Sequence, residues 1–173
     1  PEELDELLEV MKYKLRDFAH SATQSKSARS IHVVGRLDIL PSHVQASIIA
    51  AETDTAHLGP FRLNIAVGYD GREEITEAVR NFLLRRANQG ISLEDVANEL
   101  TSKDIGQCLY SKGEPEPDLI IRTSGELRLS GFLLWQSVHS ELYFCDTLWP
   151  AFRKIDFLRA LRSYQQRQRR FGQ

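Results

Sequence analysis

Two arginines and a serine lie close together in the sequence, directly after a short apolar run. Arg122 follows the run at residues 118–121, and Arg128 and Ser130 come within a few residues of it. A guanidinium presents a fork of donors that matches phosphate oxygens, so two guanidiniums beside a hydroxyl suit a dense polyanion such as diphosphate. These three residues therefore form a candidate anion site.

An alternative assignment of the same residues needs no ligand. Arg122 can pair with Glu126 or Asp118, while Arg128 lies on the surface. Two arginines this close together would repel each other unless an anion or a carboxylate lay between them. Because a carboxylate is available nearby in the sequence, the spacing alone leaves both assignments open.

The elements that must position these residues alternate between strands and helices. Short apolar runs predict strands at residues 31–34, 62–67, 118–121 and 141–144. Apolar residues at three- and four-residue spacing predict helices over about 4–18, 42–56, 75–90 and 154–170, with residues 21–30 as a loop. Alternation of this kind implies an α/β fold with a mostly parallel central sheet, helices on both faces and right-handed crossovers. A ligand of such a sheet lies outside the carboxyl ends of the strands, which is where Arg122 is expected.

Two further short helices are predicted from their first residues. Ser92 is followed three residues later by Asp95, and Thr101 is followed by Asp104 at the same spacing. In such pairs the hydroxyl and the carboxylate each accept a backbone N–H of the first helical turn. We therefore expect a helix to begin at each pair.

Length and composition indicate one ordinary globular domain over residues 1–173. The chain has 173 residues, of which 42% are hydrophobic and 27% charged, with a net charge of -2. Its two cysteines form no metal-binding pattern and are expected to be reduced. The arginine-rich segment 153–170 carries Leu158, Leu161 and Tyr164 at helical spacing, which favours a packed helix over a nucleic-acid-binding arm. Because the chain begins at Pro1 without a methionine, we expect upstream sequence to be missing.

Residues 118–150 resemble the signature of the cis-prenyltransferases, the undecaprenyl diphosphate synthase-like enzymes. They read DLIIRTSGELRLSGFLLWQSVHSELYFCDTLWP. The family pattern is close to D-L-x-I-R-T-x-G-E-x-R-x-S-x-F-L-L-W-Q, followed by E-L-Y-F and L-W-P. Supporting similarity lies at residues 31–40, 63–75 and 169–172, so the resemblance extends over the whole chain. Ser124, residues 130–132 and residues 151–153 resemble the short-chain actinobacterial members, such as Z,E-farnesyl diphosphate synthase.

The resemblance implies roles for particular residues. The positions expected to bind isopentenyl diphosphate are Arg122, Arg128, Leu129 and Ser130, together with Arg170 and Gly172 in a tail that reaches across a homodimer. Glu141 matches a carboxylate that is associated with Mg²⁺ and with the same substrate. Leu127 and His139 depart from the family pattern, which places a polar residue and a tyrosine at these positions.

The activity implied by the resemblance is the condensation of isopentenyl diphosphate with an allylic diphosphate, such as geranyl or farnesyl diphosphate. The products would be a Z-configured polyprenyl diphosphate and diphosphate. The resemblance further implies a cytoplasmic Mg²⁺-dependent homodimer that binds no nucleic acid and contacts the inner membrane face transiently during product release.

One part of the family pattern is missing from this sequence. The family's catalytic aspartate lies in an Asp-Gly-Asn-x-Arg loop, which is followed by a Ser-x-Glu-Asn-x-x-Arg element, and the chain contains neither. We therefore expect the chain to be the C-terminal portion of the catalytic domain, with the catalytic aspartate upstream. The alternative is a non-catalytic subunit that binds isopentenyl diphosphate or a partner.

Overall fold

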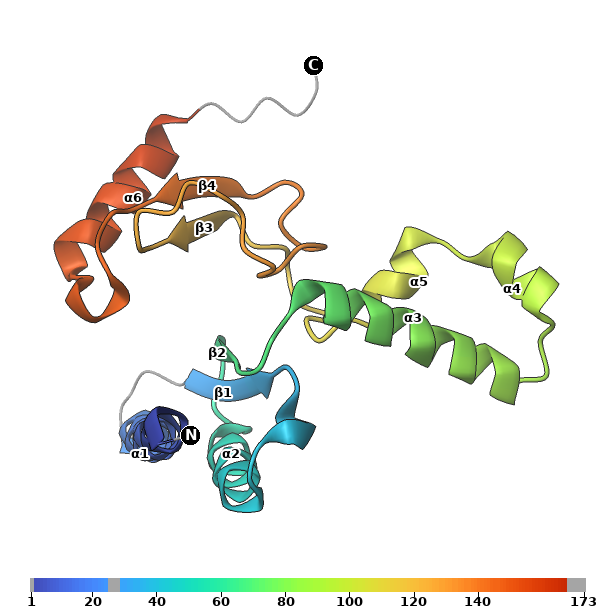
Figure 1. The fold of residues 1–173 in the computed structure, drawn as a ribbon, viewed down its shortest axis with the longest axis horizontal. Coiled ribbons are helices and arrows are strands. Elements are labelled where there is room, and N and C mark those ends of the chain that lie inside the picture. The colour runs from blue at the N-terminus through green and yellow to red at the C-terminus, as the bar shows by residue number, and fades with distance from the viewer. Residues whose placement is uncertain (1, 25–28, 168–173) are drawn as a thin grey trace. The chain divides into compact units, whose positions relative to one another are not determined.

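The computed structural model of the chain describes residues 2–24 and 29–167 (Figure 1). These residues fall into two compact units, Pro1–Asp70 and Gly71–Gln173, each of which has its own strands and helices. The single domain predicted for residues 1–173 stays a prediction. Among the described helices, none is both long enough and apolar enough to cross a membrane.

The first unit consists of two helices and two parallel strands. In chain order these are α1 (Glu2–Gln24), β1 (Arg29–Val34), α2 (Ser42–Thr55) and β2 (Phe61–Ala66). The strands pair in register over their full length, with the first residues of β1 and β2 opposite each other. A short 3₁₀ helix, Leu37–Ile39, connects β1 to α2.

Leucine and β-branched side chains form the core of the first unit. Leu15 on α1 and Ile48 on α2 are only 2% and 1% exposed, and they pack in one cluster with Val33 of β1. Because apolar residues recur at helical spacing along α1, one stripe of this helix is buried against the unit. The predicted periodicity is confirmed at Leu8 and Leu15, whereas Leu4 and Leu7, expected on the same stripe, are 58% and 63% exposed.

Side chains of α2 cover the free edge of β1. The N–H of Ile31 donates to Thr55 Oγ1 at 3.0 Å, and the N–H of Val33 donates to Glu52 Oε1 at 2.8 Å. Thr55 Oγ1 in turn donates to the carbonyl of Ala51 at 2.8 Å. These contacts satisfy two N–H groups of β1 that do not pair with β2.

The predicted loop at residues 21–30 is too long. α1 continues to Gln24 and β1 already begins at Arg29. The helix tolerates the small polar residues because Thr23 Oγ1 donates back to the carbonyl of His20 at 2.8 Å, and because Ala22 is buried at 4% exposure. Burial against the unit therefore outweighed the weak local helix preference of this segment.

The second unit begins with helices and ends with a strand pair and a helix. Its helices are α3 (Gly71–Asn88), α4 (Leu93–Glu99), α5 (Ser102–Gly106) and α6 (Lys154–Gln166). Its strands, β3 (Leu119–Arg122) and β4 (Glu141–Phe144), are parallel and in register. A 3₁₀ helix, Trp149–Ala151, precedes α6. The predicted parallel α/β class is confirmed, and among the described residues the strands pair two by two within each unit.

The predicted helix starts at Ser92 and Thr101 are confirmed. Ser92 Oγ accepts the N–H of Asp95 at 3.1 Å, and the N–H of Thr101 donates to Asp104 Oδ2 at 3.0 Å. The first turn of α6 has a similar contact, in which the N–H of Arg153 donates to Asp156 Oδ2 at 3.0 Å. This bond lowers the pKa of the Asp156 carboxyl below its ordinary value. Its stabilising effect is present above the ordinary pKa and is lost as the pH falls.

Candidate diphosphate site

Arg122 is the last residue of β3 and lies at the carboxyl end of the β3–β4 pair. Its carbonyl accepts the N–H of Cys145 at 2.8 Å, which extends the strand pairing by one bond. Its guanidinium donates to the carbonyl of Arg128. Within the described ranges, no carboxylate forms an ion pair with Arg122, so its charge is not neutralised there.

A sharp turn after β3 directs the chain toward Arg128. Ser124 and Gly125 both have positive φ, 87° and 73°, which is unusual for a residue with a side chain such as serine. Their N–H groups donate to the carbonyls of Thr147 at 3.1 Å and Cys145 at 3.0 Å. The turn is thus fixed by the segment that follows β4, and it brings the backbone of Arg128 within reach of Arg122.

Arg128 and Ser130 lie in the exposed segment after this turn. Arg128 Nε lies 3.2 Å from Glu126 Oε2, but the arginine side chain is 75% exposed, so the pair contributes little. Ser130 Oγ accepts the N–H of Phe132 at 3.3 Å, which leaves its hydroxyl hydrogen for another acceptor. Leu129, also predicted to contact the substrate, is 55% exposed.

The anion-site assignment and the ligand-free alternative differ in whether Glu126 pairs with Arg122. Glu126 pairs with Arg128 and not with Arg122, which differs from the ligand-free alternative, whereas the exposure of Arg128 agrees with it. The structure brings the Arg122 guanidinium onto the Arg128 backbone, while no hydrogen bond among the described residues joins Ser130 to either arginine side chain. Arg170 and Gly172 lie outside the described residues.

Glu141 lies at the other end of the strand pair. It is the first residue of β4 and pairs with Leu119, three positions before Arg122 in β3. Because successive side chains of a strand point to opposite faces, Glu141 and Arg122 are expected on opposite faces as well as at opposite ends. Within one chain, these two side chains are therefore not placed to share one substrate.

The carboxylate of Glu141 already has a partner in this chain. Arg167 Nη1 donates to Glu141 Oε2 at 2.6 Å, and the two side chains are 44% and 27% exposed. Nowhere in residues 2–24 and 29–167 do three or more His, Cys, Asp or Glu side chains gather as a metal site. Mg²⁺ retains waters and is often held by one or two carboxylates plus substrate phosphates. Glu141 thus fits a single ligand of such an ion.

Contacts from α3 hold the segment that follows Ser130. The N–H of Gly71 donates to the carbonyl of Gly131 at 2.8 Å, and the buried carboxylate of Glu74 accepts from Gln136 Nε2 at 3.1 Å. Neither Glu74 nor Gln136 was expected at the site from the sequence. The available signal was Gln136 itself, a polar residue that ends the apolar run at residues 132–135.

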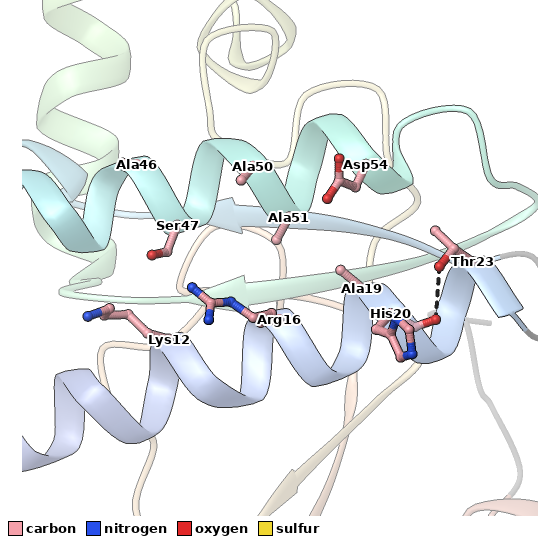
Figure 2. A pocket seen from close by; sticks show the side chains of 10 residues that line it. All are labelled: Lys12, Arg16, Ala19, His20, Thr23, Ala46, Ser47, Ala50, Ala51 and Asp54. Carbon is pink, nitrogen blue, oxygen red and sulfur yellow. Dashed lines mark hydrogen bonds between the residues drawn. The ribbon is translucent and has the colours of Figure 1, made fainter.

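The first unit carries a groove that was not expected from the sequence. It lies between α1 and α2 and has a volume of about 540 Å³ (Figure 2). Lys12, Arg16 and His20 line it from α1, and Ser47 and Asp54 from α2. Their four-residue spacing places the basic side chains on one helix face. Because Asp54 lines the same groove and Lys12 is bonded to Glu9 at 2.8 Å, the groove has mixed charge.

Comparison with known proteins reveals extensive similarity. A family model described as "Putative undecaprenyl diphosphate synthase" matches residues 1–172. A (2Z,6E)-farnesyl diphosphate synthase of Thermobifida fusca is 52% identical over 172 residues, which cover 99% of this chain and 65% of that protein. An isoprenyl transferase of Deinococcus radiodurans is 49% identical over 99% of this chain and 63% of its own length. The chain thus spans a little under two thirds of the length of these curated relatives.

Two solved structures agree with the sequence comparisons. The lavandulyl diphosphate synthase of Lavandula x intermedia, crystallised with dimethylallyl diphosphate, matches with a TM-score of 0.90 and 34% identity. The match covers 100% of this chain and 72% of that protein. A probable undecaprenyl diphosphate synthase of Campylobacter jejuni matches with a TM-score of 0.79 and 29% identity. The chain therefore belongs to the undecaprenyl diphosphate synthase family of prenyltransferases.

Proposed function

We propose that the protein containing this chain is a cis-prenyltransferase that condenses isopentenyl diphosphate with an allylic diphosphate. The observation that carries the proposal is Arg122, an arginine without a carboxylate partner among the described residues, at the ligand-binding end of a parallel strand pair. Arg128 and Ser130 follow in the adjoining loop. Of the curated relatives named above, one is an isoprenyl transferase and the other a (2Z,6E)-farnesyl diphosphate synthase, which supports the same substrate class here.

In the proposed reaction, this chain binds and orients the diphosphate of isopentenyl diphosphate. The double bond of that substrate attacks the first carbon of the allylic chain and forms the new carbon–carbon bond. The allylic C–O bond breaks, diphosphate leaves with the electron pair, and loss of a proton creates the new cis double bond. Catalysis of this kind depends on positioning and on electrostatic stabilisation, which Arg122 and Arg128 supply for the nucleophilic substrate.

We further propose that Mg²⁺ is required and that Glu141 is one of its ligands. When bound, Mg²⁺ would neutralise charge on diphosphate oxygens. In this chain Arg167 occupies the carboxylate, so the ion and the guanidinium would compete for it.

This competition predicts an effect of Arg167→Gln. The variant should lower the Mg²⁺ concentration at half-maximal binding by up to about fivefold, because a half-exposed ion pair is worth about 0–1 kcal/mol. Isothermal titration with Mg²⁺ in the presence of isopentenyl diphosphate measures it. Arg159→Gln, which removes an exposed arginine 3.3 Å from Asp156, is the matched control. A higher Mg²⁺ requirement in Arg167→Gln would instead indicate that Arg167 binds the substrate.

A homodimer is proposed on two grounds. Arg122 and Glu141 are separated within one chain, so a shared substrate would require Glu141 from a second copy. Large apolar side chains are also exposed along residues 132–149, including Val138 at 72% and Trp149 at 72%. Exposed apolar patches of this kind mark interaction surfaces. A cytoplasmic location and transient membrane contact during product release remain predictions.

Product analysis tests the proposed function. The full-length protein is incubated with Mg²⁺, isopentenyl diphosphate and geranyl or farnesyl diphosphate, and the products are identified by mass spectrometry. We expect a polyprenyl diphosphate longer by one or more isoprene units, with cis geometry in the new units by NMR. Binding of isopentenyl diphosphate without any product would favour the non-catalytic alternative, and absence of both would refute the proposal.

A further inference from the structure

The first turn of α3 contains a buried carboxylate. It belongs to Glu74, which is 2% exposed. Its Oε1 accepts the N–H of Tyr110 at 2.9 Å, and both of its oxygens face Gln136 Nε2, at 3.1 and 3.2 Å. A buried carboxylate is costly unless donors surround it, so this arrangement requires its partners to stay in place.

The hydrogen bonds of Gln136 fix the orientation of its side-chain amide. The residue is 5% exposed, and its Nε2 also donates to Ser111 Oγ at 2.9 Å. Its Oε1 is buried with no hydrogen-bond partner in the described part of the chain. Reversing the amide would bring Oε1 against the Glu74 carboxylate, where two acceptors repel. The amide is therefore held in one orientation, at the expense of an unpaired oxygen.

A second contact joins the same helical turn to the candidate site. The N–H of Gly71 donates to the carbonyl of Gly131 at 2.8 Å, and a Cβ built on Gly71 would lie 2.3 Å from that oxygen. Gly131 directly follows Ser130 in the chain. The first turn of α3 thus holds residues 131–136 at both ends, through Gly71 at one end and Glu74 at the other.

Other contacts also hold the segment: Ser140 Oγ donates to the carbonyl of Pro117 at 2.6 Å, and the N–H of Ser137 donates to the carbonyl of Leu133 at 2.9 Å. Between β3 and β4, no described residue belongs to a helix or strand. On the arginine side, the segment is held by the bond from the Arg122 guanidinium to the Arg128 carbonyl. Without regular structure, the position of Ser130 depends on these anchors and on the turn at Ser124 and Gly125.

We propose that Glu74 and Gln136 are positioning residues for the isopentenyl diphosphate site, an inference that rests on the proposed function. Neither residue binds the substrate in this account. They hold residues 131–136 against α3 and thereby hold Ser130 and the backbone of Arg128 where the diphosphate needs them. Because a lost hydrogen bond to a charged group costs about 10- to 150-fold in affinity, displacement of the Ser130 hydroxyl from the diphosphate should weaken binding of this substrate.

Gln136→Met tests the link by removing both amide donors while keeping the length of the side chain. We expect the dissociation constant of isopentenyl diphosphate to rise by about 10- to 100-fold. The dissociation constant of the allylic diphosphate should change less than about threefold, since the two substrates bind at different sites in the proposed reaction. Both are measured by isothermal titration on the full-length protein. Gln165→Met, the same change at an exposed position of α6, is the matched control and should change neither.

An exchanged pair provides the rescue. In the double variant Glu74→Gln/Gln136→Glu, the amide and the carboxylate trade places. The new amide on α3 would accept from the Tyr110 N–H and donate to the new carboxylate in the loop, which would also accept from the Ser111 hydroxyl. We expect the double variant to recover most of the affinity lost in Gln136→Met. Amide hydrogen exchange at Phe132 should be faster in Gln136→Met than in wild type and near wild type in the double variant.

The outcomes separate this inference from the proposed function. Wild-type protein that fails to bind isopentenyl diphosphate would overturn the proposed function and the inference with it. Wild-type binding that is unchanged in a folded Gln136→Met variant would overturn the inference alone. An equal loss of affinity for both substrates would also overturn it, because that result indicates a general structural role. An unchanged rate of amide exchange at Phe132 would overturn it as well, because the segment would then not depend on the link. If Gln136→Met fails to fold, a folded double variant that lacks the predicted affinity would overturn it.

Discussion

Replacing Arg122 by alanine is expected to weaken isopentenyl diphosphate binding by about 10- to 150-fold. A hydrogen bond to a charged group is worth about 1.5–3 kcal/mol, and this free energy converts to that range of affinity. Arg122 has no carboxylate partner among the described residues. Binding of the diphosphate therefore does not have to break an ion pair of Arg122 first, and the substitution removes the full contribution of the guanidinium. Isothermal titration of the folded full-length variant measures the effect.

Two further variants show which property of Arg122 matters. Arg122→Lys keeps the charge but lacks the planar fork, so it should recover only part of the affinity. Arg80→Ala removes an exposed arginine of α3 and should leave binding unchanged. Wild-type affinity in a folded Arg122→Ala variant would contradict the assignment of Arg122 to the diphosphate.

Ile48→Ala is expected to lower the free energy of unfolding by about 2–5 kcal/mol. Ile48 is 1% exposed and packs in the cluster that contains Leu15 and Val33, so truncation leaves a cavity between α2, α1 and β1. Urea unfolding of the full-length protein, followed by circular dichroism, measures the change. A lower midpoint with an unchanged slope is expected.

The next residue supplies a matched control for this substitution. Ile49 lies one position further along α2 and is 62% exposed. Ile49→Ala removes the same atoms from the protein surface and should change stability by less than about 0.5 kcal/mol. Equal effects of the two substitutions would show that the buried face of α2 is wrongly assigned.

Most elements could be predicted because their signals are local. The strand at residues 141–144 has the bounds that its apolar run predicted, and Ser92 and Thr101 begin helices as their capping partners predicted. The end of α1 could not be predicted in this way. Ala22 favours helix there because it is buried against the first unit, and burial depends on the rest of the fold.

In the candidate site, too, local signals predicted some features, while others depend on the fold. Arg122 was placed at the carboxyl end of a strand because the order of strands and helices implied parallel pairing. The partner of Glu126 could not be predicted, since it depends on the positive φ of Ser124 and Gly125. The separation of Glu141 from Arg122 required the strand register. Gln136 and Glu74 are 62 residues apart, and no spacing rule connects them.

A crystal structure of the full-length protein with isopentenyl diphosphate and an unreactive allylic analogue tests the central claim most directly. We expect diphosphate oxygens within about 3 Å of the Arg122 guanidinium, with Arg128 and the Ser130 hydroxyl completing the same anion site. A diphosphate bound elsewhere, with the Arg122 guanidinium on the Arg128 carbonyl and out of contact with phosphate, would contradict the account.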